Sequence, residues 1–194
     1  MKESLLQNYK YILETGHQTI HVYLIKKCKE GDRQAQNELY KLYVDAMYNI
    51  CMRMMGDEDE ARDILQESFI TAFTKLHTLE KEITFSGWLK RIVVNNCLNA
   101  LRSKKKIFIP LEEEADWKEE DSEDLDYQNY EVKRIMNAVE KLPHGCKEVF
   151  NLYLFEGFKH KEIAEMLNIT ESASKAQYSK ARSRIRKMLE PNPV

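Results

Sequence analysis

Basic and hydroxyl side chains recur at helical spacing near the end of the chain. Four of them, separated by four, three and four residues, fall on one side of a helix: Lys175, Ser179, Arg182 and Arg186. Lysine pairs well with guanine and glutamine with adenine, so Lys175 and Gln177 are candidates for base contacts, while the later arginines suit phosphates. The pattern predicts a helix that reads DNA. The alternative is a solvated basic face on a terminal helix.

A second polar stripe lies in the middle of the chain. Its members are separated by four, four and three residues: Arg91, Asn95, Asn99 and Arg102. Three lysines, 104–106, follow directly. Amide groups suit bases and the cations suit phosphates, although an exposed helix face with no ligand is an equal alternative. Phe85 and Trp88 precede the stripe, and either stack on an unpaired base or, at their helical spacing, belong to the core.

The elements that must position these stripes are all predicted to be helices. Apolar residues at spacings of three and four predict helices over 32–55, 57–76 and 85–104, with a loop at 77–84. Asp32 is the expected N-cap and Gly56 the expected stop of the first of these helices. Its expected apolar stripe is Ala35, Leu39, Leu42, Tyr43, Ala46, Ile50 and Met54. The exposed side of 57–76 carries Asp63, Gln66 and Glu67 with Ile70 nearby. An acidic face cannot attract DNA, so it either docks a protein partner or is simply solvated. Three such helices make a compact bundle.

The second half of the chain has a helix-turn-helix pattern. Helices are predicted over 132–142 and 144–156, followed by a short helix that ends at Asn168, a residue tolerant of positive φ. Thr170 is a suitable N-cap for the last helix. The side chains expected on the buried face of that helix are Ser174, Tyr178, Ala181, Ile185 and Leu189.

The net charge of −2 over 194 residues conceals a strong asymmetry. Residues 111–130 contain ten acidic residues and one lysine, whereas the rest of the chain holds 29 basic and 22 acidic residues. Blocks of like charge repel themselves, so 107–130 is predicted to be an acidic flexible linker between two basic domains. A solvated loop that only tethers is the plainer reading.

Several classes of protein are not expected. No apolar run approaches the roughly 18 residues of a membrane span, and the N-terminus lacks the features of a signal peptide. The four cysteines are far apart, which fits small buried side chains in a reducing compartment and predicts neither a metal site nor disulfides. His144, Cys146 and His160 lack a third catalytic partner or a phosphate-binding loop, so we expect no enzyme, no cofactor and no small-molecule substrate.

Two runs of sequence carry a resemblance to a known family. They are DEDEARDILQESFITAFTKLHTLEKEITFSGWLKRIVVNNCLNALRSKKK and IMNAVEKLPHGCKEVFNLYLFEGFKHKEIAEMLNITESASKAQYSKARSRIRKML. The first resembles the second domain, and the second resembles the fourth domain, of extracytoplasmic-function (ECF) sigma factors of bacterial RNA polymerase, in the sigma-70 family. Together they cover about residues 24 to 190, in the order typical of the family.

The resemblance implies an all-α chain of two small helical domains. These are a sigma domain 2 helical bundle at 23–106 and a sigma domain 4 helix-turn-helix at 131–190, joined by the acidic linker 107–130 and preceded by an extension, 1–22, of unknown role. The implied function is transcription initiation at promoters with −10 and −35 elements, including help with DNA melting. The implied partners are core RNA polymerase, through the clamp helices of its largest subunit, promoter DNA, and an anti-sigma factor, soluble or membrane-bound. The implied location is the cytoplasm.

The resemblance also assigns roles by position. Core-polymerase contacts fall on Asp63, Ile64, Gln66 and Glu67, and contacts with the −10 element fall on Trp88, Arg91, Asn95, Asn99 and Arg102. The 77–84 loop matches the segment that captures a flipped base. Contacts with the −35 element fall on Lys175, Ala176, Gln177, Ser179, Lys180, Arg182 and Arg186. Asn99, Ser174 and Tyr178 depart from the usual residue types, so promoter preference cannot be copied from relatives.

Three other functions are kept as rivals. A stand-alone helix-turn-helix regulator would protect a palindromic operator without polymerase. A helical adaptor that binds only proteins would keep its activity after loss of the basic stripe. An enzyme built around His144 and Cys146, or around His160, is the least supported.

Overall fold

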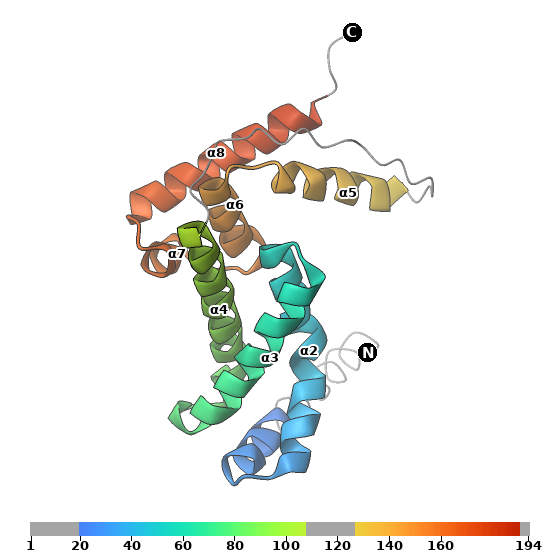
Figure 1. Ribbon diagram of the computed structural model, residues 1–194, viewed down its shortest axis with the longest axis vertical. Helices are drawn as coiled ribbons and strands as arrows, with labels where there is room; N and C mark the ends of the chain where they lie inside the picture. Colours follow the sequence, from blue (N-terminus) through green and yellow to red (C-terminus); the bar gives the residue numbers. More distant parts are fainter. Residues whose placement is uncertain (1–19, 108–126, 191–194) are drawn as a thin grey trace, which may run out of the picture. The chain divides into compact units, whose positions relative to one another are not determined.

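The computed structural model describes residues 20–107 and 127–190, and its chain divides into two compact units, Met1–Lys106 and Ile107–Val194. Every regular element within the described residues is helical, which confirms the all-α prediction (Figure 1). Most of the expected N-terminal extension and acidic linker lies outside the described residues. No helix in the described part of the chain is long and apolar enough to cross a membrane.

Unit 1 is a bundle that contains the three predicted helices in the predicted order, preceded by one helix that was not predicted. A first helix covers residues 20–29. It is followed by α2 (Arg33–Met55), α3 (Glu58–Lys75), two short 3₁₀ turns, η1 (Leu76–Thr78) and η2 (Glu82–Thr84), and α4 (Phe85–Ile107). The segment predicted as a loop at 77–84 thus consists largely of two tight turns. Figure 1 shows α2 and α3 next to each other, and the two helices are in contact.

Polar caps fix the ends of α2 and α3. The Asp32 carboxylate accepts hydrogen bonds from the backbone N–H groups of Gln34 and Ala35, at 2.8 and 3.1 Å. Gly56 ends α2 with a φ of 73°, a left-handed conformation that favours glycine. Asp57 then caps α3 through the N–H of Glu60 at 2.9 Å. The predicted cap at Asp32 and stop at Gly56 are therefore confirmed.

The core of unit 1 differs from the predicted α2 stripe at two positions. Leu42 and Ala46 are exposed, whereas Met47 and Cys51 are buried. Apolar residues occur on more than one side of α2, so helical period alone did not identify the face that packs against the bundle. All four cysteines of the chain are buried thiols, as predicted. Burial raises the pKa of Cys28 to about 11 because it penalises the charged thiolate.

Unit 2 contains the predicted helix-turn-helix. Its elements are α5 (Tyr127–Glu140), α6 (His144–Phe150), a π-helical turn η3 (Asn151–Phe155), α7 (His160–Leu167) and α8 (Glu171–Leu189). The helix predicted over 144–156 is therefore an α-helix that widens into a π turn before Gly157, which has a φ of 74°. The core joins α5, α6 and α8 through Ala138, Val139, Leu142, Cys146, Phe150, Ala181 and Ile185.

The turn between α7 and α8 is fixed by two residues. Asn168 has φ 55° and ψ 48°, the left-handed conformation that asparagine tolerates better than most residues. Thr170 caps α8, because its hydroxyl accepts a hydrogen bond from the N–H of Ala173 at 3.1 Å. Ile163 and Ala164 of α7 are buried, and α7 is in contact with α8. The sequence-based prediction of this turn is confirmed.

Replacement of the Thr170 cap should weaken unit 2. Thr170→Ala removes one hydrogen bond to the first turn of α8, which typically costs about 1 kcal/mol. We expect hydrogen exchange of the slowest amides in α8 to accelerate about fivefold in the full chain. Ser183→Ala, at an exposed position in the middle of the same helix, is the control. Equal exchange rates in the two variants would show that the cap does not stabilise this helix.

Candidate functional site

The exposed side of α8 is a basic stripe. Lys175, Ser179, Arg182 and Arg186 are all exposed, as are Ala176 and Lys180 beside them. The opposite side of the same helix is buried against unit 2 through Ser174, Ala181 and Ile185. The helix therefore presents three cations and a hydroxyl along one side, in the arrangement expected from the sequence.

Gln177 lies on another side of α8 and has a protein partner. Its Oε1 accepts a hydrogen bond from the Cys146 thiol at 3.0 Å, and its side chain is partly buried against α6. A Cβ added to the neighbouring Gly145 would come within 3.3 Å of the Gln177 Nε2. The predicted base contact of Gln177 therefore requires this amide to leave α6, which makes it a weaker candidate than Lys175.

Lys175 already has an anionic partner on its own helix. Its Nζ is 2.7 Å from the Glu171 carboxylate, one turn earlier. The hydrogen bond from Lys175 and its charge lower the pKa of Glu171, with smaller contributions from His160 and Lys161. Both side chains are well exposed, so the pair contributes little to stability. An anionic ligand can take the place of this carboxylate at little cost.

Aromatic and polar groups hold α8 against η3 and α7. The ring of Tyr178 lies 4.5 Å from that of Tyr153 and 5.9 Å from that of Phe150. His160 stacks on Tyr153 at 4.3 Å, and its Nδ1 is 2.9 Å from the buried Ser174 hydroxyl. The guanidinium of Arg182 lies 5.9 Å from the Tyr178 ring centre. Ser174 and Tyr178, which depart from the usual residue types, are therefore both held by specific contacts. Ser174 contacts His160, and Tyr178 contacts the rings of Phe150 and Tyr153.

The stripe on α4 is exposed as predicted. Arg91, Asn95, Asn99 and Arg102 all face away from the core. Arg102 donates a long hydrogen bond, 3.5 Å, to the Asn99 side-chain oxygen. The opposite side of α4 is fully buried at Phe85, Leu89, Val93, Val94, Cys97 and Leu98. The helix thus separates an apolar core face from a polar face that includes two amides.

Two further contacts orient α4 and were not predicted. Asn96 donates from Nδ2 to the buried Ser68 hydroxyl of α3 at 3.0 Å. Lys104, near the end of α4, pairs with Glu60 at the start of α3. The sequence offers only a weak signal for either, namely a third asparagine next to Asn95 and an acidic N-terminus on α3. These contacts fix the rotation of α4, and hence where its polar face points.

Trp88 lies at the edge between the two faces of α4. Its ring is partly exposed, and it tilts at 38° against the buried Phe85 ring at 5.9 Å. Phe85 is a core residue, since only 1% of its surface is exposed. The core interpretation is therefore confirmed for Phe85. For the partly exposed Trp88, contact with a base stays a prediction.

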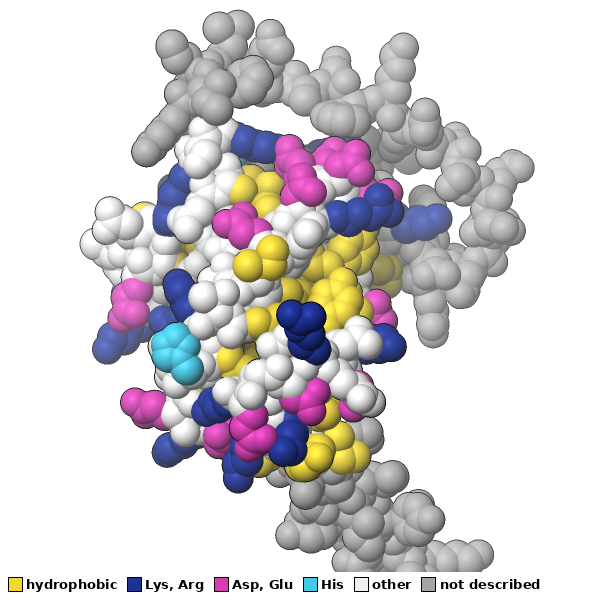
Figure 2. Space-filling model, turned by 60° about the horizontal axis from the view of Figure 1, so that its bottom comes forward, with side chains coloured by type: hydrophobic (Ala, Val, Ile, Leu, Met, Phe, Trp, Pro, Cys, Tyr) yellow, Lys and Arg dark blue, Asp and Glu magenta, His cyan; other side chains and the backbone are white. Residues whose placement is uncertain are grey.

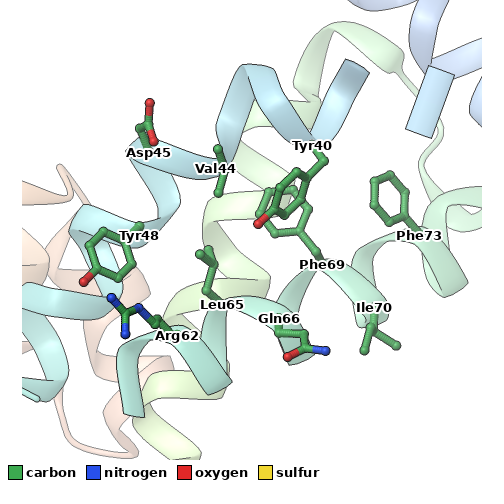
Figure 3. Close-up of a pocket in the computed structure, with 10 residues that line it drawn as sticks. All are labelled: Tyr40, Val44, Asp45, Tyr48, Arg62, Leu65, Gln66, Phe69, Ile70 and Phe73. Atoms are coloured by element: carbon green, nitrogen blue, oxygen red, sulfur yellow. The ribbon is translucent and has the colours of Figure 1, made fainter. Parts of the chain in front are cut away.

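A groove of about 560 Å³ lies between α2 and α3. Its lining is Tyr40, Val44, Asp45 and Tyr48 from α2, and Arg62, Leu65, Gln66, Phe69, Ile70 and Phe73 from α3 (Figure 3). Tyr40 and Phe69 form an edge-to-face pair at 4.7 Å. Ile70 is 60% exposed, and Figure 2 shows that hydrophobic side chains do gather at the surface, among charged ones. An exposed apolar surface of this kind is typical of a protein-binding site.

The four predicted protein-binding residues on α3 are not equivalent. Gln66 lines the groove, and Asp63 and Glu67 are exposed on the same helix. Ile64 is only 7% exposed and packs in the core of unit 1, so it supports the helix from inside rather than offering a contact surface. Arg62, which was not predicted, and Ile70, which the sequence placed near this acidic face, also line the groove. In the sequence, the signal for this apolar contact surface was an isoleucine on an otherwise acidic helix face.

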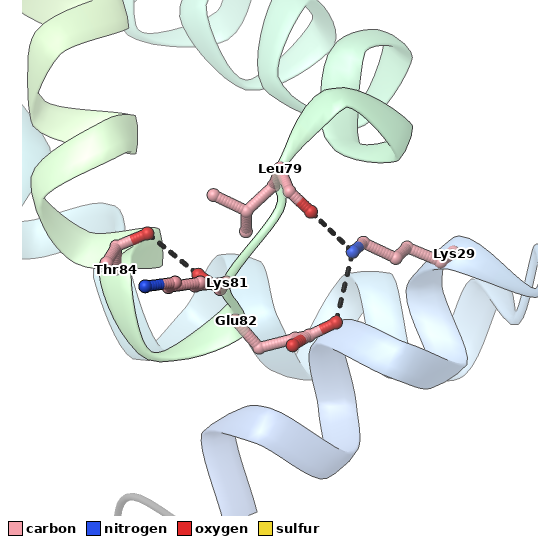
Figure 4. A network of polar contacts seen from close by, with 5 residues as sticks. All are labelled: Lys29, Leu79, Lys81, Glu82 and Thr84. Atoms are coloured by element: carbon pink, nitrogen blue, oxygen red, sulfur yellow. Dashed lines mark hydrogen bonds and ion pairs between the residues drawn. The ribbon is translucent and has the colours of Figure 1, made fainter.

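The connection between α3 and α4, residues 76–84 and hereafter the 76–84 loop, is attached to the first helix by Lys29, another residue that was not predicted. The Lys29 ammonium donates to the Leu79 carbonyl at 2.7 Å and to the Glu82 carboxylate at 3.1 Å (Figure 4).

Within the residues that the structure describes, no group of three His, Cys, Asp or Glu side chains could hold a metal ion.

Comparison with known proteins identifies similar chains over nearly the whole length. Residues 39–107 match the family Sigma-70 region 2, and residues 133–185 match Sigma-70, region 4. The ECF RNA polymerase sigma factor SigW of Bacillus subtilis is 30% identical over 85% of this chain and 94% of its own length. The RNA polymerase sigma-H factor of Pseudomonas aeruginosa is 26% identical over 87% of this chain and 93% of its own.

Two solved structures share the fold. CnrH in complex with the cytosolic domain of CnrY has a TM-score of 0.56 at 20% identity, and covers 90% of this chain and 99% of that one. The sigma factor RpoE in complex with the anti-sigma factor NepR, from Bartonella quintana, has a TM-score of 0.55 at 20% identity, over 81% of this chain and 98% of that one.

The aromatic ring of Tyr178, rather than its hydroxyl, should stabilise unit 2. Tyr178→Ala removes a partly buried ring that contacts Phe150, Tyr153 and His160, and we expect a loss of about 2 kcal/mol. Tyr178→Phe keeps the ring and should stay within about 0.5 kcal/mol of the parent. Proteolysis of the full chain in increasing urea, with cuts mapped to unit 2, measures the difference. Equal losses in both variants would point to the hydroxyl instead.

Proposed function

The chain is a transcription initiation factor of the sigma-70 family, in its extracytoplasmic-function group, and from this premise we propose which of its surfaces perform each part of initiation. The single observation that carries the proposal is that two separate helices, α4 and α8, each bury one face and expose an opposite polar stripe. We assign 23–106 to −10 recognition and core binding, and 131–190 to −35 recognition, with 107–130 as the acidic linker. Residue 107 of this linker is the last of α4, and residues 127–130 form the start of α5.

Helix α8 reads the −35 element in this proposal. The second helix of a helix-turn-helix enters the major groove and contacts bases near its N-terminus. Lys175 and Ala176 lie in that part of α8, and Arg182 and Arg186 follow toward the C-terminus, where phosphates are expected. On DNA, Lys175 exchanges the Glu171 carboxylate for an acceptor on a base. Gln177 contributes only if it gives up its contact with Cys146.

Helix α4 and the 76–84 loop act on the −10 element. Asn95 and Asn99 supply donors and acceptors for unpaired bases, and Arg91 and Arg102 supply charge for the backbone. Opening the duplex requires a base to leave the stack, at a cost of a few kcal/mol that binding must offset. The partly exposed Trp88 ring and the loop are the surfaces that can hold such a base.

The groove between α2 and α3 docks core RNA polymerase. Its apolar floor suits a helical partner, and Arg62, Asp45 and Gln66 at its border offer polar contacts. The clamp helices of the largest polymerase subunit are the proposed occupant. The factor itself supplies no catalytic group and works in the cytoplasm, where the polymerase acts. One fold relative was solved with an anti-sigma factor, and we propose a partner of that class here as well.

In vitro transcription from genomic DNA tests this function directly. Core polymerase with this chain should initiate at new, mapped start sites that core polymerase alone does not use. A stand-alone regulator would instead protect its operator without polymerase, and two sigma regions in one chain disfavour that alternative. Failure to associate with core polymerase and to add start sites would overturn the proposal.

Two pairs of substitutions should separate DNA reading from polymerase docking. Lys175→Ala with Arg182→Ala removes cations from the α8 stripe, and we expect about tenfold or greater loss of promoter-specific transcription with unchanged co-purification of polymerase. Gln66→Ala with Glu67→Ala should weaken co-purification instead.

The matched control for the first pair is Arg184→Ala with Lys187→Ala. It removes the same charge from α8 outside the Lys175–Arg186 stripe. We expect a much smaller loss of promoter-specific transcription. If the control pair and the stripe pair lose equal activity, then net charge rather than a reading face explains the binding.

A further inference from the structure

The loop between α3 and α4 has an exposed outer side and two buried leucines. Leu76 and Leu79 are buried in the core of unit 1, whereas Glu80, Lys81 and Ile83 are exposed. Ile83 is 63% exposed, unusually high for a large apolar side chain. The outer side of the loop is therefore available to a ligand while its two leucines hold it to the core.

A single side chain from outside the loop connects its two 3₁₀ turns. Lys29 is the last residue of the helix at 20–29, about fifty positions earlier in the sequence. Its ammonium binds the carbonyl of Leu79, directly after η1, and the carboxylate of Glu82, the first residue of η2. Figure 4 shows Lys29 reaching both from the neighbouring helix. The local contact from Thr84 Oγ1 to the Lys81 carbonyl, 2.7 Å, shapes η2 alone.

The charges at this contact favour its formation. The backbone hydrogen bond at Glu82 and the hydrogen bond from Lys29 lower the pKa of the Glu82 carboxyl, so it is ionised at neutral pH. The Lys29 and Glu82 side chains are only 25% and 23% exposed, less than those of the Lys27–Glu30 pair on the same helix. A partly shielded ion pair that also binds a backbone carbonyl restricts the loop more than an exposed pair would.

We propose that Lys29 is a positioning residue for promoter opening, which holds the 76–84 loop in the shape that receives an unpaired base of the −10 element. The inference rests on the proposed function of this loop, and adds that the first helix of unit 1 takes part in DNA melting without touching DNA. A loop fixed before binding loses less conformational entropy when the base arrives. Loss of Lys29 therefore weakens base capture without weakening the docking of polymerase.

The test compares Lys29→Met with Lys27→Met in the reconstituted holoenzyme. Both variants remove one cation from the same helix, but Lys27 pairs with Glu30 and not with the loop. We expect Lys29→Met to slow promoter opening by about fivefold or more. The permanganate reactivity of the melted thymines measures the rate of opening. Lys27→Met should open at the parental rate, and both should bind core polymerase equally well.

Abasic single-stranded −10 oligonucleotides identify the step that is affected. An oligonucleotide that lacks the captured base should bind the parent holoenzyme much more weakly than the intact oligonucleotide does. For Lys29→Met, the two oligonucleotides should differ only slightly in affinity. Lys29→Arg, which retains the cation and the donors, should recover most of the difference. Glu82→Gln keeps the loop length and should show part of the same loss, so the proposal can be tested even if Lys29→Met folds poorly.

The possible results separate this inference from the function on which it rests. If Lys29→Met and Glu82→Gln open promoters as fast as Lys27→Met, then the positioning role is wrong while the sigma function stands. If Lys29→Met loses equal affinity for intact and abasic oligonucleotides, then Lys29 does not act through base capture. If the parent chain opens no promoter, then the proposed function itself fails.

Discussion

The burial of one face of a helix while the opposite face stays polar is the constraint on which both proposed DNA-binding surfaces depend. In α4, six fully buried apolar residues pack against the rest of unit 1. The Asn96–Ser68 and Lys104–Glu60 contacts set the rotation of the helix. In α8, the buried Ala181 and Ile185 have the same role. Because side chains on a helix diverge by about 100° per residue, fixing the buried face also fixes where the polar stripe points.

Neither surface needs to bind DNA tightly alone. The α4 stripe has two cations and the α8 stripe has three, so each makes only a few phosphate contacts, which gives weak and salt-sensitive binding. When both units are carried by one polymerase, the second contact becomes effectively intramolecular, and modest affinities combine. If the groove between α2 and α3 docks polymerase as proposed, it is therefore as important to promoter selection as the proposed DNA-facing residues, since it attaches both units to one carrier.

Features that depend on local sequence could be predicted, and those that depend on contacts between distant residues could not. Asp32, Gly56 and Thr170 mark helix ends through hydrogen bonds within a few residues, so their roles were visible in the sequence. Ile64 belongs to a run that resembles a polymerase-binding motif, yet packing turns it inward. Gln177 and Lys29 find partners 31 and 50 positions away, and no periodicity reports such contacts.

The buried cysteines have a consequence for how the factor can respond to oxidative stress. Oxidants such as peroxide attack the thiolate, and a thiol with a pKa of about 11, as at Cys28, is almost entirely protonated inside a cell. The other three thiols are buried as well, where reagents reach them only when the fold opens. Direct oxidation of these cysteines would therefore require the fold to open first.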